Sequence, residues 1–173
     1  MVPGGTVTAI DISPEMLATA RKRIAGLGLS NISFREGRAE QIPALSGQFD
    51  VVLASLSLMY VIDRDAAARE IARVLRPGGC FVAAVWGGPE VADIVLFQQL
   101  ERAGIQARVE SHTTEFSFDD FPSAWAVLAG VTTAQLPPDR QEEAKAAVRA
   151  KMWPDGERSR RFINRTVFVI GTR

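Results

Sequence analysis

Four short segments of the chain carry the side chains best suited to chemistry, and each directly follows a stretch that predicts a β-strand. Ligands of a doubly wound sheet bind at the carboxyl ends of its strands, so the four segments predict one shared binding edge. The first segment is Asp11, whose carboxylate could accept both hydrogen bonds of a ribose diol. An ordinary turn residue explains a single aspartate at a strand end equally well.

The other three segments are residues 37–40, 54–56 and 86–88. Gly37 would let the backbone pass close to the edge of a purine ring, although the segment is also an ordinary loop. The small residues at positions 54 and 55 leave room for a ligand beside the sheet, or they let a helix pack closely. Trp86 could form the wall of a pocket, and a core position explains it equally well.

The sequence does not identify a general base, for which the candidates are Tyr60, Asp63, His112 and Glu115. The ordinary pKa of histidine suits proton transfer, but His112 lies on a predicted edge strand of alternating polarity, which favours a solvated side chain. Cys80 lies inside a predicted buried strand and is better explained by packing than by nucleophilic chemistry. One cysteine and one histidine predict no metal site.

The composition is that of an ordinary globular domain of 173 residues, with 47% hydrophobic and 23% charged residues. Twenty basic and 20 acidic side chains give no net charge, so we expect no nucleic acid partner. The most apolar stretch, residues 51–62, is shorter than the ~18 residues that a membrane span needs. The N-terminal residues show no signal peptide, so the expected location is cytoplasmic.

Alternating strands and helices must position the four segments. Apolar runs predict buried strands, Ser13 is the expected N-cap of the first helix, and Asp63 or Asp65 is the expected cap of the second. The predicted strands are residues 6–10, 31–35, 49–55 and 80–86, and the predicted helices are residues 14–27, 64–75 and 91–103. This order predicts an α/β fold with a doubly wound, mostly parallel sheet and helices on both faces, with the strand at 49–55 covered on both sides.

The pattern changes after Gly104. Residues 107–118 predict a long edge strand, residues 123–128 and 138–152 predict helices, and residues 165–172 predict a last strand. No linker divides the chain. We therefore expect a single domain over residues 1–173, with a cofactor-binding core at 1–104 and C-terminal edge strands and helices at 105–173.

Three segments, taken in order, resemble the class I S-adenosylmethionine-dependent methyltransferases, of the type that acts in quinone biosynthesis and on many small molecules. They read VTAIDISPEMLATARKR, ISFREGRAEQIP and FDVVLASLSLMYVIDRDAAAREIARVLRPGGCFVAAVW, and the resemblance covers residues 4 to about 88. It implies a Rossmann-like methyltransferase fold with an antiparallel closing strand. It also implies that S-adenosylmethionine is the cofactor and that its methyl group passes to a small-molecule acceptor by direct in-line displacement.

The same resemblance implies a role for seven residues around the cofactor. Asp11 would hold the ribose hydroxyls, and the other six residues would lie near the adenine or the methionine portion. The residues expected near the adenine are Ile12, Met16, Arg38 and Ala39, and those expected near the methionine portion are Ser55 and Leu56.

The chain departs from the family pattern in two places. The family's first strand, Gly-rich turn and first helix have no counterpart before the strand that ends at Asp11, so we expect an N-terminally truncated fold. Arg38 stands where the family usually has an aspartate that accepts from the adenine amino group, and arginine has no acceptor. Without the family's first strand, the strands at 6–10 and 49–55 keep unpaired edges. We expect them to pair with each other, or a second copy of the chain to cover them in a homodimer.

Two other function classes stay open at this point. The first is a catalytically inactive methyltransferase-like remnant or interaction module. The second is an NAD(P)-dependent oxidoreductase, because such folds also carry an acidic residue at the end of the second strand. The segment DISPEML and the RPGG-strand unit argue against the oxidoreductase.

Overall fold

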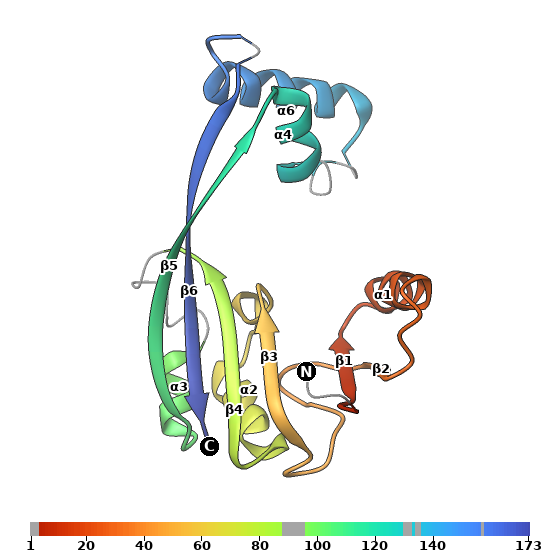
Figure 1. The fold of residues 1–173 in the computed structure, drawn as a ribbon, viewed down its shortest axis with the longest axis vertical. Helices are drawn as coiled ribbons and strands as arrows, with labels where there is room; N and C mark the ends of the chain where they lie inside the picture. The colour runs from red at the N-terminus through yellow and green to blue at the C-terminus, as the bar shows by residue number, and fades with distance from the viewer. Residues whose placement is uncertain (1–3, 88–95, 130–132, 134–135, 157) are drawn as a thin grey trace. The chain divides into compact units, whose positions relative to one another are not determined.

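The computed structural model describes residues 4–87, 96–129, 133, 136–156 and 158–173. The chain divides into two compact units, which are described separately here. Unit 1 comprises Met1–His112 and Arg165–Arg173, and unit 2 comprises Thr113–Asn164. Figure 1 shows the order of the elements along the chain.

The first part of unit 1 is a strand-helix-strand segment. Strand β1 (Val7–Asp11) is followed by helix α1 (Pro14–Gly26) and strand β2 (Ile32–Glu36), and β1 pairs with β2 in parallel. Ser13 caps α1, because its hydroxyl accepts the backbone N–H of Met16 at 3.2 Å. The predicted elements are therefore confirmed here, with strand bounds shifted by one residue.

A four-stranded sheet forms the second part of unit 1. Its order is β3-β4-β6-β5, in which β4 is parallel to β3 and antiparallel to β6. The sheet is mixed, and the predicted α/β class with an antiparallel closing strand is confirmed. The strands are β3 (Phe49–Ser55), β4 (Leu75–Trp86), β5 (Gln106–Phe118) and β6 (Arg160–Thr172), and the helical segments between them are η1 (Leu58–Tyr60), α2 (Arg64–Val74) and α3 (Phe97–Arg102). The first residues of the predicted helix at 91–103 lie outside the described residues.

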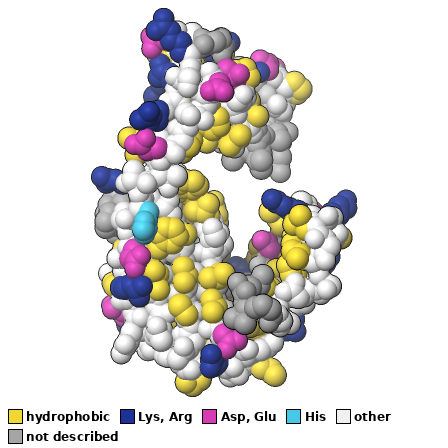
Figure 2. Space-filling view, in the orientation of Figure 1, with side chains coloured by type: hydrophobic (Ala, Val, Ile, Leu, Met, Phe, Trp, Pro, Cys, Tyr) yellow, Lys and Arg dark blue, Asp and Glu magenta, His cyan; other side chains and the backbone are white. Residues whose placement is uncertain are grey.

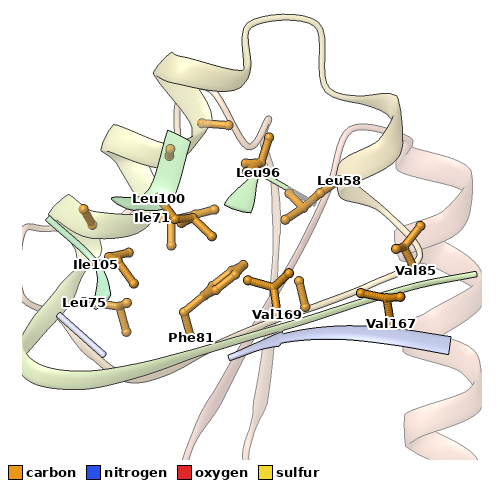
Figure 3. Close-up of a cluster of buried hydrophobic side chains, with 14 residues drawn as sticks. Leu58, Ile71, Leu75, Phe81, Val85, Leu96, Leu100, Ile105, Val167 and Val169 are labelled. Atoms are coloured by element: carbon orange, nitrogen blue, oxygen red, sulfur yellow. The ribbon is translucent and has the colours of Figure 1, made fainter. Parts of the chain in front are cut away.

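The main core lies between the four-stranded sheet and helices α2 and α3 (Figure 3). Asp63 caps α2, because its Oδ1 accepts the backbone N–H of Ala66 at 2.9 Å. Four of the five residues predicted for the inner stripe of this helix lie on α2 and are buried: Ala67, Ala68, Ile71 and Val74. The fifth, Leu75, is also buried but is the first residue of β4. Ala67, Ala68, Ile71 and Leu75 pack in one cluster with Phe81, which is completely buried, and with alternate residues of β4 and β6.

The opposite face of the same sheet is open. Val52 and Ala54 pack against the core, whereas Val51 and Leu53, which point the other way, are 49% and 74% exposed. Figure 2 shows hydrophobic side chains gathered on this face. The prediction that residues 49–55 are covered on both sides is therefore wrong, because α2 and α3 both pack on one face.

The predicted pairing between the strand at 6–10 and the strand at 49–55 is also wrong. Strand β1 pairs only with β2, and β3 pairs only with β4, within the part of the chain that the structure describes. Direct pairing would require the connection at residues 37–48 to shift, and backbone groups of this connection are hydrogen-bonded to α2. The alternative, a second copy of the chain covering these edges, stays a prediction.

Unit 2 has a small aromatic core of its own. It contains helix α4 (Phe121–Leu128), helix α6 (Pro138–Met152) and the outer parts of β5 and β6. Phe121, Ala124 and Trp153 are buried together, and the indole N–H of Trp153 donates to the carbonyl of Arg158 at 2.8 Å. Both helices were predicted near these bounds.

The described residues contain neither a membrane-spanning helix nor a cluster of metal ligands. None of their helices is long and apolar enough to cross a membrane. Among the same residues, no group of three or more His, Cys, Asp or Glu side chains could hold a metal ion.

Candidate functional site

Strand β1 ends at Asp11, and one of the two carboxylate oxygens of Asp11 is hydrogen-bonded to the backbone of the following turn. Oδ1 accepts the backbone N–H of Ser13 at 2.9 Å, which fixes the turn into α1. No hydrogen bond to Oδ2 is found among the described residues. One carboxylate oxygen of Asp11 therefore has the structural role expected of a turn residue. The other oxygen is available to accept a hydrogen bond from a ligand.

Two apolar side chains extend from the chain next to Asp11. Ile12 and Met16, on the turn and the first turn of α1, are 56% and 59% exposed. A large apolar side chain at the surface gains free energy when it is covered. At the end of β1 and the start of α1, the sequence thus brings a carboxylate and two exposed apolar side chains close together along the chain, and this stretch is called the rim.

The loop after β2 begins directly beside Asp11. The backbone N–H of Gly37 donates to the carbonyl of Asp11 at 3.1 Å, so the two strand ends are joined by a hydrogen bond. Arg38 extends into solvent and pairs loosely with Glu40, at 3.6 Å between Nε and Oε2. Ala39 packs its methyl group against the main core, which leaves its backbone as the part that a ligand could use.

Glu40 connects this loop to the segment after β3, and the sequence analysis gave it no role. Its Oε1 accepts the backbone N–H of Ile62 at 3.2 Å. Burial raises the pKa of Glu40, but backbone hydrogen bonds, including those from Ile62 and Asp63, and the charge of Arg38 outweigh it and lower the pKa. Glu40 is thus held as a carboxylate, and it links the loop after β2 to the chain at Ile62.

Ser55 and Leu56 lie at the carboxyl end of β3. Leu56 has a φ of 54°, in the left-handed region that a leucine rarely adopts, and its N–H donates to the carbonyl of Ala84 at 2.9 Å. A strained non-glycine residue costs about 1–3 kcal/mol and is often found at a functional site. Among the described residues, no hydrogen bond joins Ser55 or Leu56 to Asp11, and β1 and β3 are not paired. The hydrogen bond between Gly37 and Asp11 thus joins the loop after β2 to the end of β1, and the end of β3 has no such link to Asp11.

A cavity of about 530 Å³ lies along the loop after β2. Of the seven predicted site residues, only Arg38 lines it, and Asp11 does not. The other lining residues come from the end of β2, from the loop and from α2: Glu36, Gly37, Gln41, Ile42, Pro43, Ala44, Glu70 and Arg73.

Glu70 and Arg73 form a two-point ion pair on α2 at the edge of this cavity. The Nε–Oε1 and Nη2–Oε2 distances are 2.6 and 2.7 Å. The hydrogen bonds from Arg73 hold the pKa of Glu70 below its ordinary value, against the opposing effect of burial. The sequence analysis did not identify this pair, although a glutamate three residues before an arginine on a helix is a recognisable signal.

The ionised carboxylate of Glu70 should therefore stabilise the folded protein near neutral pH, and this stabilisation should be lost in acid. Its pKa is lower in the folded chain than in the unfolded chain, so the stabilisation is complete above about pH 4.5 and is lost as the pH falls through the lowered value. Urea unfolding of the wild type and of Glu70→Gln, measured between pH 6 and pH 3, tests this. The difference in unfolding free energy should shrink toward low pH, and a constant difference would contradict the assignment.

Gly37 is needed in the loop because of crowding. A Cβ at this position would lie 2.6 Å from Cδ of Pro43 and 3.2 Å from Cγ2 of Ile10. We expect Gly37→Ala to lower the unfolding free energy by about 1–3 kcal/mol, since the proline ring cannot bend away. Gly26→Ala is the control, because open space surrounds that position at the end of α1. Equal unfolding free energies for Gly37→Ala and the wild type in urea titrations would disprove the crowding.

The four candidate bases are all at least partly exposed, and three of them have structural partners. Asp63 caps α2, and Glu115 pairs with Arg161 at 3.3 Å. Tyr60 is 79% exposed. His112 lies edge-on against Phe168, with its Nε2 3.7 Å from a carboxylate oxygen of Glu110. The geometry singles out none of them as a base.

Comparison with known proteins gives one family match and several relatives. The family model described as a methyltransferase domain matches residues 2–83. A demethylmenaquinone methyltransferase of Chlorobaculum parvum is 44% identical over 79 residues, which cover 46% of this chain and 31% of that protein. The uncharacterized protein Rv1405c of Mycobacterium tuberculosis is 36% identical over 83 residues, which cover 48% of this chain and 30% of that protein. The matched part thus spans about a third of the length of these relatives.

Solved structures share the fold along nearly the whole chain. The YcgJ protein from Bacillus subtilis has a TM-score of 0.67 at 16% identity, with 97% of this chain and 82% of that chain covered. A phosphoethanolamine N-methyltransferase of Haemonchus contortus in complex with S-adenosyl-L-methionine has a TM-score of 0.61 at 14% identity, covering 97% and 43%. The [4+2]-cyclase SpnF has a TM-score of 0.62 at 21% identity, covering 96% and 65%. At these identities the similarity concerns the fold alone.

Proposed function

We propose that this chain is a class I S-adenosylmethionine-dependent methyltransferase, which binds S-adenosylmethionine and takes part in methyl transfer to a small-molecule acceptor. The match of residues 2–83 to a methyltransferase domain and the 44% identity to a demethylmenaquinone methyltransferase over 79 residues support this proposal. The family match is in the part of the chain that contains β1, α1, β2 and β3. A fold likeness would not be sufficient support, since a cyclase shares the architecture.

The observation that carries the proposal is the free acceptor on Asp11. Its Oδ2 has no hydrogen-bond partner among the described residues, while Oδ1 is fixed by Ser13. A carboxylate held in this way at the end of a parallel strand suits the two hydroxyl groups of a ribose. The exposed Ile12 and Met16 supply apolar surface for the adenine ring at the same rim.

The remaining assignments follow the order of the segments along the sheet. The backbone at Arg38 and Ala39 would border the adenine edge, since the guanidinium of Arg38 has no acceptor for the amino group. Ser55 and Leu56 would border the methionine portion at the end of β3.

The cofactor, when bound, would supply a methyl group on a sulfonium, and the neutral thioether that leaves needs no protonation. The chain's own part is then to align the two reactants and to exclude water. A base is required only if the acceptor must lose a proton, and the acceptor itself is assigned here only as a small molecule.

Binding and transfer assays test the proposal against its two alternatives. We expect calorimetry to detect binding of S-adenosylhomocysteine and no binding of NADH. We also expect tritium to pass from methyl-labelled S-adenosylmethionine to small molecules of a cell extract. A folded chain that binds neither compound would favour an inactive remnant. Binding of NADH with hydride transfer, followed by absorbance, would favour an oxidoreductase.

A further inference from the structure

The Glu70–Arg73 pair makes more contacts than α2 requires. The helix already has a cap at Asp63 and a buried apolar stripe. An isolated ion pair between residues three apart on a helix contributes only about 0.2–0.5 kcal/mol. The role of the pair must therefore be inferred from its other hydrogen bonds.

Those hydrogen bonds go to the backbone of the loop between β2 and β3. Oε2 of Glu70 accepts the N–H of Ile42 at 2.8 Å, and Nη2 of Arg73 donates to the carbonyl of the same residue at 3.0 Å. Nη1 of Arg73 donates to the carbonyl of Ala44 at 2.8 Å. The backbone carbonyl of Arg73 accepts the N–H of Gly47 at 2.8 Å. One helical turn thus satisfies backbone groups at three points of a segment that has no regular secondary structure.

The same loop borders the proposed cofactor site at its other end. Gly37 is hydrogen-bonded to Asp11, and Glu40 is hydrogen-bonded to Ile62. Gln41 donates its N–H to the carbonyl of Arg38 at 3.1 Å, so the stretch at 38–41 is a tight turn directly before the anchored residue Ile42. The position of the backbone at residues 38 and 39 therefore depends on where Ile42 is held.

We propose that Glu70 and Arg73 are positioning residues that set the adenine-facing backbone at Arg38 and Ala39. This inference rests on the proposed function and adds to it the origin of the base selectivity. Because Arg38 has no side-chain acceptor, recognition of the adenine edge falls to backbone groups, which are correct only if the loop is in place. Neither residue of the pair needs to touch the cofactor.

The first test compares two ligands that differ only at the purine edge, S-adenosylhomocysteine and S-inosylhomocysteine. Arg73→Lys keeps the positive charge but cannot form the forked contacts with Glu70, Ile42 and Ala44. We expect it to weaken binding of the adenine compound about tenfold, the effect of one lost hydrogen bond, and to leave the inosine compound nearly unchanged. Glu70→Gln retains an oxygen that can accept from Ile42, so its effect should be smaller.

The matched control is Arg102→Lys, which alters an exposed ion pair of α3 with Asp65 at 3.4 Å. Its affinity for both compounds should equal that of the wild type. Equal weakening of both compounds by Arg73→Lys, or a lower melting temperature with both affinities unchanged, would mean a purely structural role and would overturn the inference.

Amide hydrogen exchange without ligand supplies a second readout. In Arg73→Lys the amide of Ile42 should exchange faster, because the side chains of Glu70 and Arg73 hold the backbone of this residue. The amide of Ile71 in α2 should stay protected. Unchanged protection at Ile42 would overturn the inference even if the wild type binds S-adenosylhomocysteine. A wild type that binds neither compound would instead overturn the proposed function, and faster exchange would then show anchoring of the loop without a role in recognition.

Discussion

Replacing Asp11 with alanine should weaken the binding of S-adenosylhomocysteine by about 100-fold or more. The variant removes a charged acceptor that would receive two hydrogen bonds from the ribose, and a hydrogen bond to a charged group contributes about 1.5–3 kcal/mol. Loss of the Ser13 contact would also loosen the turn into α1. Isothermal titration calorimetry on the folded variant measures the change.

Two further variants separate the ribose contact from the turn. Asp11→Asn keeps an oxygen for the N–H of Ser13 but loses the charge, so the turn should persist while affinity falls, though less than in Asp11→Ala. Asp50→Asn is the control, because Asp50 also lies on a strand and its side chain is 76% exposed in an ion pair with Arg76. If Asp11→Ala binds as tightly as the wild type, Asp11 is a turn residue and the proposed ribose contact is wrong.

Replacing Trp153 with alanine should destabilise unit 2 by about 3–5 kcal/mol. The indole is 97% buried, with only 3% of its surface exposed, and its ring centroid lies 5.8 Å from that of Phe121 and 5.6 Å from that of Phe162. The variant removes these contacts together with the hydrogen bond to the carbonyl of Arg158. We expect amides in residues 113–164 to lose protection from exchange while those of β3 and β4 keep it.

Two further variants serve as comparisons: one keeps an aromatic ring at position 153, and the other removes a different tryptophan. Trp153→Phe keeps an aromatic ring and loses the indole N–H, so it should cost roughly 1–3 kcal/mol. Trp86→Ala is the control, because Trp86 is 51% exposed at the end of β4. A loss below about 1 kcal/mol for Trp153→Ala in urea unfolding would show that the aromatic cluster does not hold unit 2 together.

Local signals account for the elements that the sequence predicted well. Strand β3 has the predicted bounds, and Ser13 and Asp63 cap the helices as expected. A cap depends on a side chain and an N–H a few residues away, and a strand depends on a run of apolar residues. Both kinds of information lie within a short window of sequence.

Long-range partners were not predictable in the same way. Glu70 and Ile42 are 28 residues apart, and nothing at either position indicates the other. The expected β1–β3 pairing failed for a related reason, because two apolar strands with free edges do not by themselves reveal which edges meet. The choice depends on how the intervening loop is held.

The sequence by itself determined the order of strands and helices and the residue types at the strand ends. Both follow from residue patterns that repeat every few positions, because the preference of a short segment for strand or helix depends mainly on the residues within it. Only the tertiary structure decided that Asp11 shares a hydrogen bond with Gly37, that one face of β3 stays uncovered, and that an ion pair on α2 holds the loop. These depend on which distant backbone groups satisfy one another, and that is determined only when the whole chain has packed.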